Sequence, residues 1–445
     1  MKEQVTIQKT IDVRYEADLL VVGAGPAGIA AAVYATRRGL KVRVIEAGSC
    51  LGGLGTSGMV PAFMPFTDGE HFLAGGFGRE LRDRLIRDGG IFIPKDGKLR
   101  NDSIRVEGLK RTYEQLFEEE KISYTYHTKL IDVVKEDASH VGLAVVAAKS
   151  GVYAIRAKVF VDGTGDGDLC VLAGADFAYG DGDGNAMPGT LCTLWGGIDW
   201  ETVYGPEGRG YAQERIEEAI QDGVFTLEDR HLPGMWRVGE TLGGGNIGHT
   251  FGVNGTDEVS LTEAYIWGRK SIREYEYFYK HYMRGFENME LVYTAPLMGI
   301  RETRRIVCDY TLGFRDFNAR AIFDDEIGRF SYPIDIHIAK PDKESFEEFK
   351  KNLHTALGRG ENYGIPYRSL LPVGLDNVWV AGRCIGVDRP MQASIRVMPC
   401  CYITGQAVGA AAALYVKEAK SSSRAVDIRA LQAMLKESGA YLPNC

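Results

Sequence analysis

The hydrophobic positions near the N-terminus fall in short, nearly continuous runs. Residues 19–22 are all apolar, residues 27–38 are mostly small, and residues 40–45 form a second run rich in valine. Short continuous apolar runs are typical of strands that are buried on both faces of a parallel sheet. Gly39 is suited to end the intervening helix. The pattern therefore predicts a β–α–β unit at residues 19–45.

Further elements follow along the chain. Helices are expected at residues 79–87 and 111–120, and a strand at 153–161 runs into a glycine-rich turn at 162–166. A long helix is expected to start at Ser260, which with Glu263 matches a capping box, and to run to about Arg284. Residues 376–382 again indicate a buried strand, and 405–416 a helix of small residues.

This order predicts an α/β protein in which one domain is interrupted by another. Residues 17–184 form the first part of a Rossmann-like nucleotide-binding domain, a parallel sheet with helices, with a small insertion near 60–120. The aromatic-rich residues 185–368 form an inserted α+β substrate or cap domain, and residues 369–445 return to the first domain.

Composition narrows the class of protein. Of the 445 residues, 45% are hydrophobic and 25% are charged, as in globular proteins. The net charge of −8 disfavours nucleic acid as a partner. The longest apolar stretch, residues 19–35, is interrupted by glycine and proline, so no membrane partner is expected. The cysteines are scattered and no signal peptide is apparent, which favours a cytoplasmic protein. A homo-oligomer is expected only because most soluble oligomers are homo-oligomers.

A glycine motif carries the clearest chemical signal. Gly23, Gly25 and Gly28 have G-x-G-x-x-G spacing between a strand and a helix, which is typical of dinucleotide-binding loops. The first glycine permits a tight turn, the second lets a diphosphate approach, and the third lets helix and strand pack closely. Glu46 ends the next strand, where a carboxylate binds ribose hydroxyls and repels a 2′-phosphate. FAD or NAD is therefore expected, and NADP is not.

Several later segments separate FAD from NAD. A second glycine-rich loop follows at residues 52–58, and further motifs stand at 162–168, 299–305, 332–337, 365–368, 377–384 and 394–399. In this order they resemble the FAD-dependent oxidoreductase family of the glutathione-reductase-like flavoproteins, over almost the whole chain. The resemblance implies FAD as the cofactor.

The resemblance also implies a set of FAD-binding positions. One departure is Arg383, where many flavoproteins have an acid for the ribityl chain; an arginine cannot accept those hydroxyl hydrogens, so the contact must differ. The positive end of the helix after Pro399 is expected to face the flavin. The implied FAD-binding residues are Gly23, Gly25, Pro26, Ala27, Gly28, Glu46, Ala47, Gly53, Leu54, Gly55, Thr56, Leu130, Thr164, Gly165, Asp166, Gly382, Arg383, Arg396, Val397 and Met398.

Four side chains of the middle region are candidate catalytic residues. His249 and His337 could exchange a proton with a substrate hydroxyl or carbon. Arg301 and Arg304 could bind a carboxylate or stabilise an enolate-like oxygen, although ion pairing with neighbouring acids would also explain them. No zinc-type spacing of cysteine and histidine is present, so no metal is expected.

Three functions remain open at this point. The favoured one is hydride transfer between flavin N5 and a small organic substrate, as dehydrogenation of a hydroxylated, sugar-like compound. The alternatives are an ene-reductase similar to fumarate-reductase flavoproteins and a non-catalytic FAD-binding protein. A base such as His337 or His249 suits the first, and an arginine clamp suits the second.

Overall fold

Most of the predicted nucleotide-binding domain surrounds one seven-stranded sheet. In the computed structural model the strand order is β3-β2-β1-β6-β5-β4, with β15 paired to β6 beside this path. Strands β3, β2, β1, β6 and β15 are parallel, and β5 and β4 join antiparallel, so the sheet is mixed. The structure describes residues 5–95, 97, 102–205, 213–231, 234–347 and 355–445.

The expected helices and strands of this domain are present among further ones, and α3 and α11 begin five and seven residues earlier than expected. Their bounds are β1 Val13–Val22, α1 Pro26–Arg37, β2 Val42–Ile45, α2 Phe77–Arg87, α3 Val106–Glu119, β3 Ser123–Thr125, β4 Thr128–Lys135, β5 Val141–Ala148, β6 Gly151–Asp162, α4 Asp168–Leu172, β7 Phe177–Tyr179, β15 Val378–Val380, α10 Arg389–Ile395, α11 Met398–Lys417 and α12 Ile428–Glu437.

The strand register brings the chemically interesting loops to one edge. Val22 of β1 lies beside Ile45 of β2 and Asp162 of β6, and Val380 of β15 also pairs with Asp162. The loops that follow these four strands therefore meet at the carboxyl edge of the sheet, which is where open α/β sheets bind ligands.

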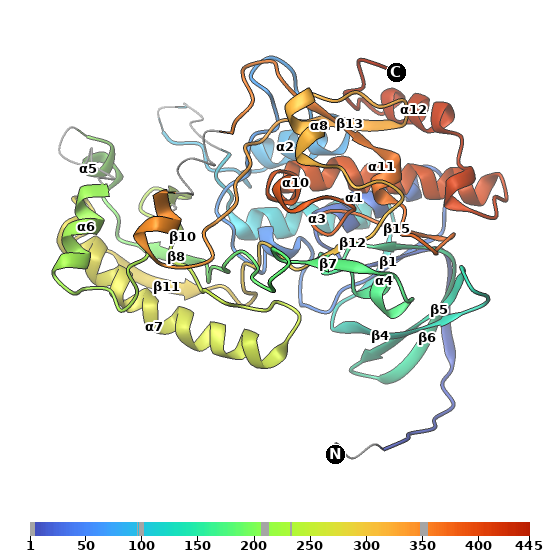
Figure 1. Cartoon of the computed structure of the whole chain (residues 1–445), viewed down its shortest axis with the longest axis horizontal. Coiled ribbons are helices and arrows are strands. Elements are labelled where there is room, and N and C mark those ends of the chain that lie inside the picture. Colours follow the sequence, from blue (N-terminus) through green and yellow to red (C-terminus); the bar gives the residue numbers. More distant parts are fainter. Residues whose placement is uncertain (1–4, 96, 98–101, 206–212, 232–233, 348–354) are drawn as a thin grey trace.

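The inserted region forms a second sheet and a second core. Its strands are β8 Thr193–Gly196, β9 Gly234–Arg237, β10 Gly243–Asn246 and β11 Glu290–Thr294, in the order β11-β8-β10-β9. With them lie α5 Trp200–Tyr204, α6 Gln213–Gln221 and α7 Glu258–Tyr282, at the left of Figure 1. Buried side chains between residues 191 and 300 make up most of this core, so the region packs as a unit.

Most buried hydrophobic side chains after residue 300 belong with the large core, while Ile338 and Phe346 pack with Phe251 of the inserted region. Strand β12 (Arg304–Ile306) pairs with β7, β13 (Glu326–Phe330) pairs with β14 (Tyr363–Pro366), and α8 (Phe314–Ala319) lies close by. Ile306, Phe330 and Ile365 are buried among side chains of the nucleotide-binding domain. The domain boundary at residue 368 stays a prediction.

The start of α7 differs from the expected one. The helix begins at Glu258, and its N-cap is Asp257, whose side chain accepts a hydrogen bond from Ser260 N at 2.7 Å. Ser260 Oγ instead accepts from Asn254 N. The expectation of Ser260 as the cap was wrong: the helix starts at Glu258, so Asp257 takes the N-cap position and Ser260 lies inside the first turn, where its own N–H is the one that is capped.

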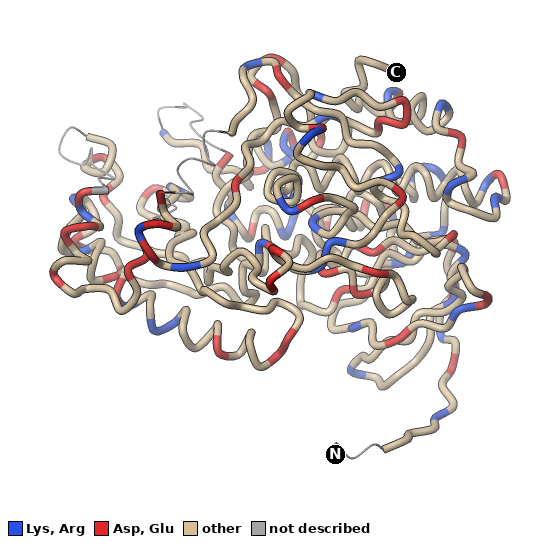
Figure 2. The backbone as a smooth tube through the Cα atoms, in the orientation of Figure 1, with Lys and Arg blue, Asp and Glu red and all other residues tan. Residues whose placement is uncertain are grey.

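Among the described residues no single helix is long and apolar enough to cross a bilayer. Only α10 and α11 taken together have the length and composition for it, and a 93° bend separates them. Figure 2 shows acidic and basic residues interspersed through both parts of the molecule.

Helix α11 packs on α1 with almost no room between their backbones. The helix is buried from Met398 to Tyr415, and glycines occupy the two points of closest approach. A Cβ at Gly405 would collide with Ala27 O, and one at Gly409 would collide with Ala31 O.

Substituting Gly409→Val should therefore destabilise the fold. We expect the free energy of unfolding to fall by about 1–3 kcal/mol from overpacking. Lys417→Val, at the exposed end of the same helix, is the matched control and should cost no more than about 0.7 kcal/mol. Denaturant titration followed by circular dichroism measures both; equal effects would contradict this account of the helix contact.

Candidate active site

The first glycine loop forms an open cradle at the start of α1. Gly23 has φ +89°, which favours glycine, and a Cβ there would lie 2.7 Å from Gly163 O. A Cβ at Gly25 would meet only Gly163 O, at 3.7 Å, so it would point into open space. No side chain caps α1 and no acid stands in its first turn. This helix end is therefore suited to hold a diphosphate.

Glu46 is held at the same loop. Its Oε2 accepts a hydrogen bond from Ala24 N at 2.8 Å, and its Oε1 accepts from Gly48 N at 2.7 Å. Each carboxylate oxygen retains a lone pair for a ribose hydroxyl. Ala47, which follows Glu46, is exposed, and Leu130 lies buried on β4.

The second glycine loop lies against the first. Gly52 N donates to Ala24 O at 2.8 Å, and a Cβ on Gly53 would lie 3.2 Å from Gly25 Cα. A Cβ on Gly55 would lie 2.7 Å from Met398 Sδ, at the start of α11.

The returning segment completes the cradle. A Cβ on Gly382 would lie 3.1 Å from Ala27 Cβ, and Gly382 N donates to Thr404 Oγ1. No side chain caps the N-terminus of α11 at Val397. Predicted FAD-binding residues from three distant segments thus line one region, with the N-termini of α1 and α11 beside the second glycine loop.

Arg383 makes contacts unlike those of a ribityl-binding acid. Its Nε donates to Gly165 O at 2.9 Å, its Nη2 pairs with Asp166 Oδ1 at 2.5 Å, and its Nη1 bonds Ile300 O. Arg383 therefore links the turn after β6 to Ile300, at the end of the inserted cap region. Thr164 bonds Asp162 Oδ1 through its own hydroxyl, so its side chain supports the turn.

Two candidate catalytic histidines lie in direct contact. His249 Nε2 and His337 Nδ1 are 2.9 Å apart, although 88 positions separate them in the chain. A carboxylate stands at each end of the pair: Asp229 Oδ2 is 3.0 Å from His249 Nδ1, and Asp335 Oδ1 is 3.5 Å from His337 Nε2. Both imidazoles are buried.

Arg301 brings a positive charge to this cluster. Its Nη1 donates to Pro188 O and Thr190 Oγ1, both at 2.9 Å, and its Nη2 donates to Asn246 Oδ1 at 3.3 Å. These acceptors are all neutral, and among the described residues Arg301 forms no ion pair with a carboxylate. A buried guanidinium with neutral partners is suited to bind an anionic oxygen.

Burial sets the charge states in the cluster. It lowers the pKa of His337 well below the ordinary value, and the positive charge of Arg301 acts in the same direction. Burial likewise lowers the pKa of Arg301 to about 10. Burial opposes ionisation of Asp335, but the neighbouring His337 and Arg396 outweigh it and lower its pKa. At neutral pH the cluster thus contains a neutral His337, a charged Arg301 and an ionised Asp335.

The cluster is joined to the expected flavin-binding segment. Arg396 Nη2 pairs with Asp335 Oδ2 at 2.9 Å, and Gln392 Nε2 donates to Arg301 O at 2.7 Å. Both come from the segment just before α11.

Sequence reasoning missed Asp229 and His231. The His231 ring centroid lies 4.9 Å from that of His249 and 4.7 Å from that of His337. One signal was available: Asp229 and His231 have the same Asp-x-His spacing as Asp335 and His337. Nothing in the sequence indicated that the two pairs would meet.

Arg304 is not part of this cluster. Its Nη1 pairs with Asp168 Oδ1 at 2.7 Å and bonds Asp166 O, and its guanidinium lies over the ring of Phe177. The structure thus brings together three of the four candidate catalytic residues.

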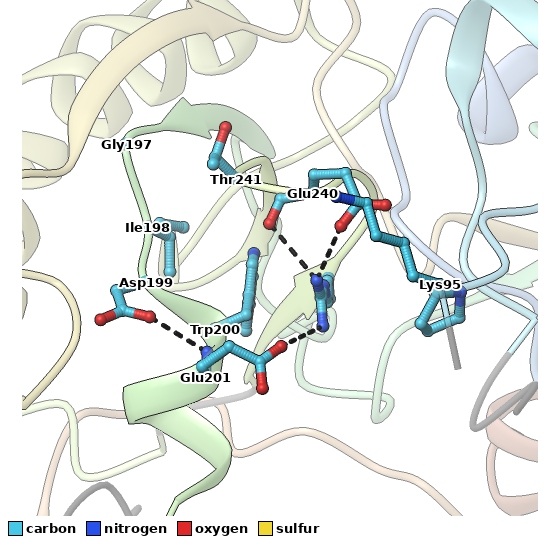
Figure 3. A pocket seen from close by; sticks show the side chains of 10 residues that line it. Lys95, Gly197, Ile198, Asp199, Trp200, Glu201, Glu240 and Thr241 are labelled. Atoms are coloured by element: carbon cyan, nitrogen blue, oxygen red, sulfur yellow. Dashed lines mark hydrogen bonds and ion pairs between the residues drawn. The ribbon is translucent and has the colours of Figure 1, made fainter. Parts of the chain in front are cut away.

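Two pockets lie in or beside the cap. One, of about 910 Å³, is lined by Thr56 and Ser57 of the second glycine loop and by Thr193 and Gly244 of the cap sheet. The other, of about 680 Å³, is shown in Figure 3, where Glu201 and Glu240 lie in its wall. Both carboxylates pair with Arg237, which also lines this pocket. None of the predicted site residues lines this second pocket.

The fold and the cradle define a flavoprotein of the oxidoreductase class. Residues 18–435 match the profile of the FAD dependent oxidoreductase family, so the chain belongs to that family and its cofactor is FAD.

A search of curated proteins finds similarity to a ferredoxin–NADP reductase of Saccharopolyspora erythraea. The two are 34% identical over 145 residues, which are 32% of this chain and 37% of that protein. The chain thus matches little more than a third of that relative's length.

Similar solved structures include a geranylgeranyl bacteriochlorophyll reductase-like protein from Thermoplasma acidophilum, at 13% identity and a TM-score of 0.44. It is aligned over 96% of this chain and 84% of that one. Another is a p-nitrophenol 4-monooxygenase from Pseudomonas putida, at 12% identity and a TM-score of 0.47, over 95% and 85%.

Gly25→Val tests the cradle. We expect this variant to lose bound flavin while its own stability stays near that of the flavin-free parent, because the added side chain enters ligand space. In Gly28→Val, by contrast, the new Cβ collides with Gly23 O, so stability should fall together with flavin binding. Flavin absorbance per protein and thermal unfolding distinguish the two; a Gly25→Val protein that keeps its flavin would refute the placement.

Proposed function

We propose that this protein dehydrogenates a hydroxylated small molecule and that the imidazole cluster activates the hydroxyl group. The observation that carries the proposal is the buried contact of His249 with His337, flanked by two carboxylates and beside Arg301. When bound, FAD supplies the two-electron acceptor of such a reaction at its N5 atom.

One hydrogen bond and two close carboxylates suggest which nitrogen is the base. Asp229 favours a hydrogen on Nδ1 of His249, so Nε2 of His249 accepts the hydrogen of His337 Nδ1. In this tautomer Nε2 of His337 carries no hydrogen, and it lies 3.5 Å from Asp335 Oδ1. A proton taken up there is stabilised by the carboxylate of Asp335.

The neighbouring residues have supporting roles. Arg301 provides a positive charge for the substrate oxygen as it loses its proton. Asp229 does not need to touch the substrate and acts as a positioning residue, because it fixes the tautomer of His249 and thereby of His337.

His337→Gln should slow flavin reduction by about 10²-fold or more, the usual contribution of a general base. A panel of polyols, glycosides and hydroxy acids first identifies the compound that bleaches the flavin of the parent fastest. The rate of flavin reduction by that compound is then measured by anaerobic stopped-flow absorbance. His281→Gln, at an exposed position near the end of α7, is the control and should match the parent. An unchanged rate in His337→Gln would remove this residue from the reaction.

Asp229→Asn should slow the same step without releasing flavin. An amide can donate toward His249 Nδ1 and so favours the tautomer with its hydrogen on Nε2, which reverses the hydrogen bond to His337. We expect a drop in the reduction rate of at least about 10-fold at unchanged flavin content. A loss of flavin in parallel with activity would instead indicate a structural role.

The pH dependence of flavin reduction follows from the direction of the pKa shifts of His337 and Arg301. Because the pKa of His337 is lowered, its neutral form persists as pH falls, so the reduction rate should stay level from pH 8 to 6. The rate should decline as pH rises through about 10, where Arg301 loses its charge. A rate that halves near pH 6.5 would contradict the assignment of His337 as base.

The same panel distinguishes the alternatives. An ene-reductase would have a flavin that no hydroxylated donor reduces. After reduction by dithionite, this flavin would pass its electrons to an enoate. Flavin that exchanges electrons with neither class would favour a non-catalytic FAD-binding protein.

A further inference from the structure

The three buried or half-buried histidines form an arrangement that the hydroxyl-activating role does not fully explain. One ligand nitrogen from each of His231, His249 and His337 lies within 4.8 Å of the others. His231 is not needed for the hydrogen bond between the other two rings. We propose that these three side chains bind one divalent transition-metal ion.

The two best-placed nitrogens already have metal-like spacing. His249 Nε2 and His337 Nδ1 are 2.9 Å apart. Two nitrogens on one tetrahedral ion, with bonds of about 2.0–2.1 Å, are about 3.3 Å apart, so only a small separation is required. The His231 nitrogen lies within 4.8 Å of the other two, so a movement of this half-buried ring can complete the site.

The carboxylates support metal binding by these nitrogens. A metal-bound histidine almost always donates its other N–H to a carboxylate or carbonyl oxygen, which fixes the ring. Asp229 lies 3.0 Å from Nδ1 of His249, and Asp335 lies 3.5 Å from Nε2 of His337. Each carboxylate therefore favours a hydrogen on the nitrogen next to it. The other nitrogen, Nε2 of His249 or Nδ1 of His337, faces the neighbouring histidine and is the one that can bind a metal.

The type of ligand atom narrows the class of metal. Three imidazole nitrogens suit zinc and its late first-row neighbours and do not suit magnesium or calcium.

A cation here would act on the substrate hydroxyl in place of His337. It takes the place of the hydrogen that His249 and His337 share, and His337 then carries its hydrogen on Nε2, toward Asp335, and no longer serves as the base. A site with three protein ligands leaves a position open, where a bound hydroxyl oxygen becomes more acidic. Only this catalytic consequence rests on the proposed function; metal binding itself does not.

The test uses the full FAD-loaded chain after treatment with a chelator. Titration with Zn²⁺, followed by calorimetry, should show one tight site per chain. His231→Phe keeps a ring in place but removes the ligand atom, and should weaken Zn²⁺ binding at least 100-fold. The control is His140→Phe, because His140 also lies beside an acid, Asp137, but on the surface. The Zn²⁺ affinity of His140→Phe should equal that of the parent.

A second measurement needs no variant. Co²⁺ added to the parent should give visible absorption bands typical of a nitrogen-bound ion, and Zn²⁺ should abolish them. No tight Zn²⁺ site, or equal affinity in His231→Phe and the parent, would overturn the proposal. Flavin reduction of the metal-free protein separately tests the dehydrogenation, so either proposal can fail while the other stands.

Discussion

The close contact between α1 and α11 is the constraint on which the remaining structure depends. Gly405 and Gly409 let α11 approach the backbone of α1 at Ala27 and Ala31. Because of this approach, the N-termini of both helices lie beside the glycine loop at residues 52–58, and both leave their first N–H groups without a side-chain cap. Two positive helix ends are thus directed to one region, which is favourable for an anionic cofactor.

A second constraint is the balance of charge at the base of the cap. The cluster contains two carboxylates, two arginines and three imidazoles, all within a largely buried volume. A buried charge is expensive unless it is paired, and here Asp335 pairs with Arg396 while Asp229 lies against His249. Among the described residues the hydrogen-bond acceptors of Arg301 are neutral, although Asp335 and Asp229 lie near enough to act on its charge. The two carboxylates and the two arginines of the cluster therefore balance one another.

Arg383 shows how a departure from a family pattern can be compensated. It replaces an acid that many flavoproteins use, yet its guanidinium pairs with Asp166 and bonds the backbone at Gly165 and Ile300. Asp166 also accepts a hydrogen bond from Thr303 Oγ1 at 2.7 Å. The position therefore connects the predicted FAD-binding turn with the segment that carries Arg301.

The sequence by itself determined the class of protein, because the motifs are local. The first glycine loop, Glu46 and the continuous apolar strands depend on neighbouring residues and on the period of the chain, and all were predicted. It also placed His249, His337 and Arg301 among the candidates, but each as a separate possibility. Only the tertiary structure decided that these three meet, that Arg304 pairs elsewhere, and that Asp229 and His231 join them. Contacts between residues 229, 249, 301 and 337 depend on how the cap and the large core pack, and no local pattern encodes that packing.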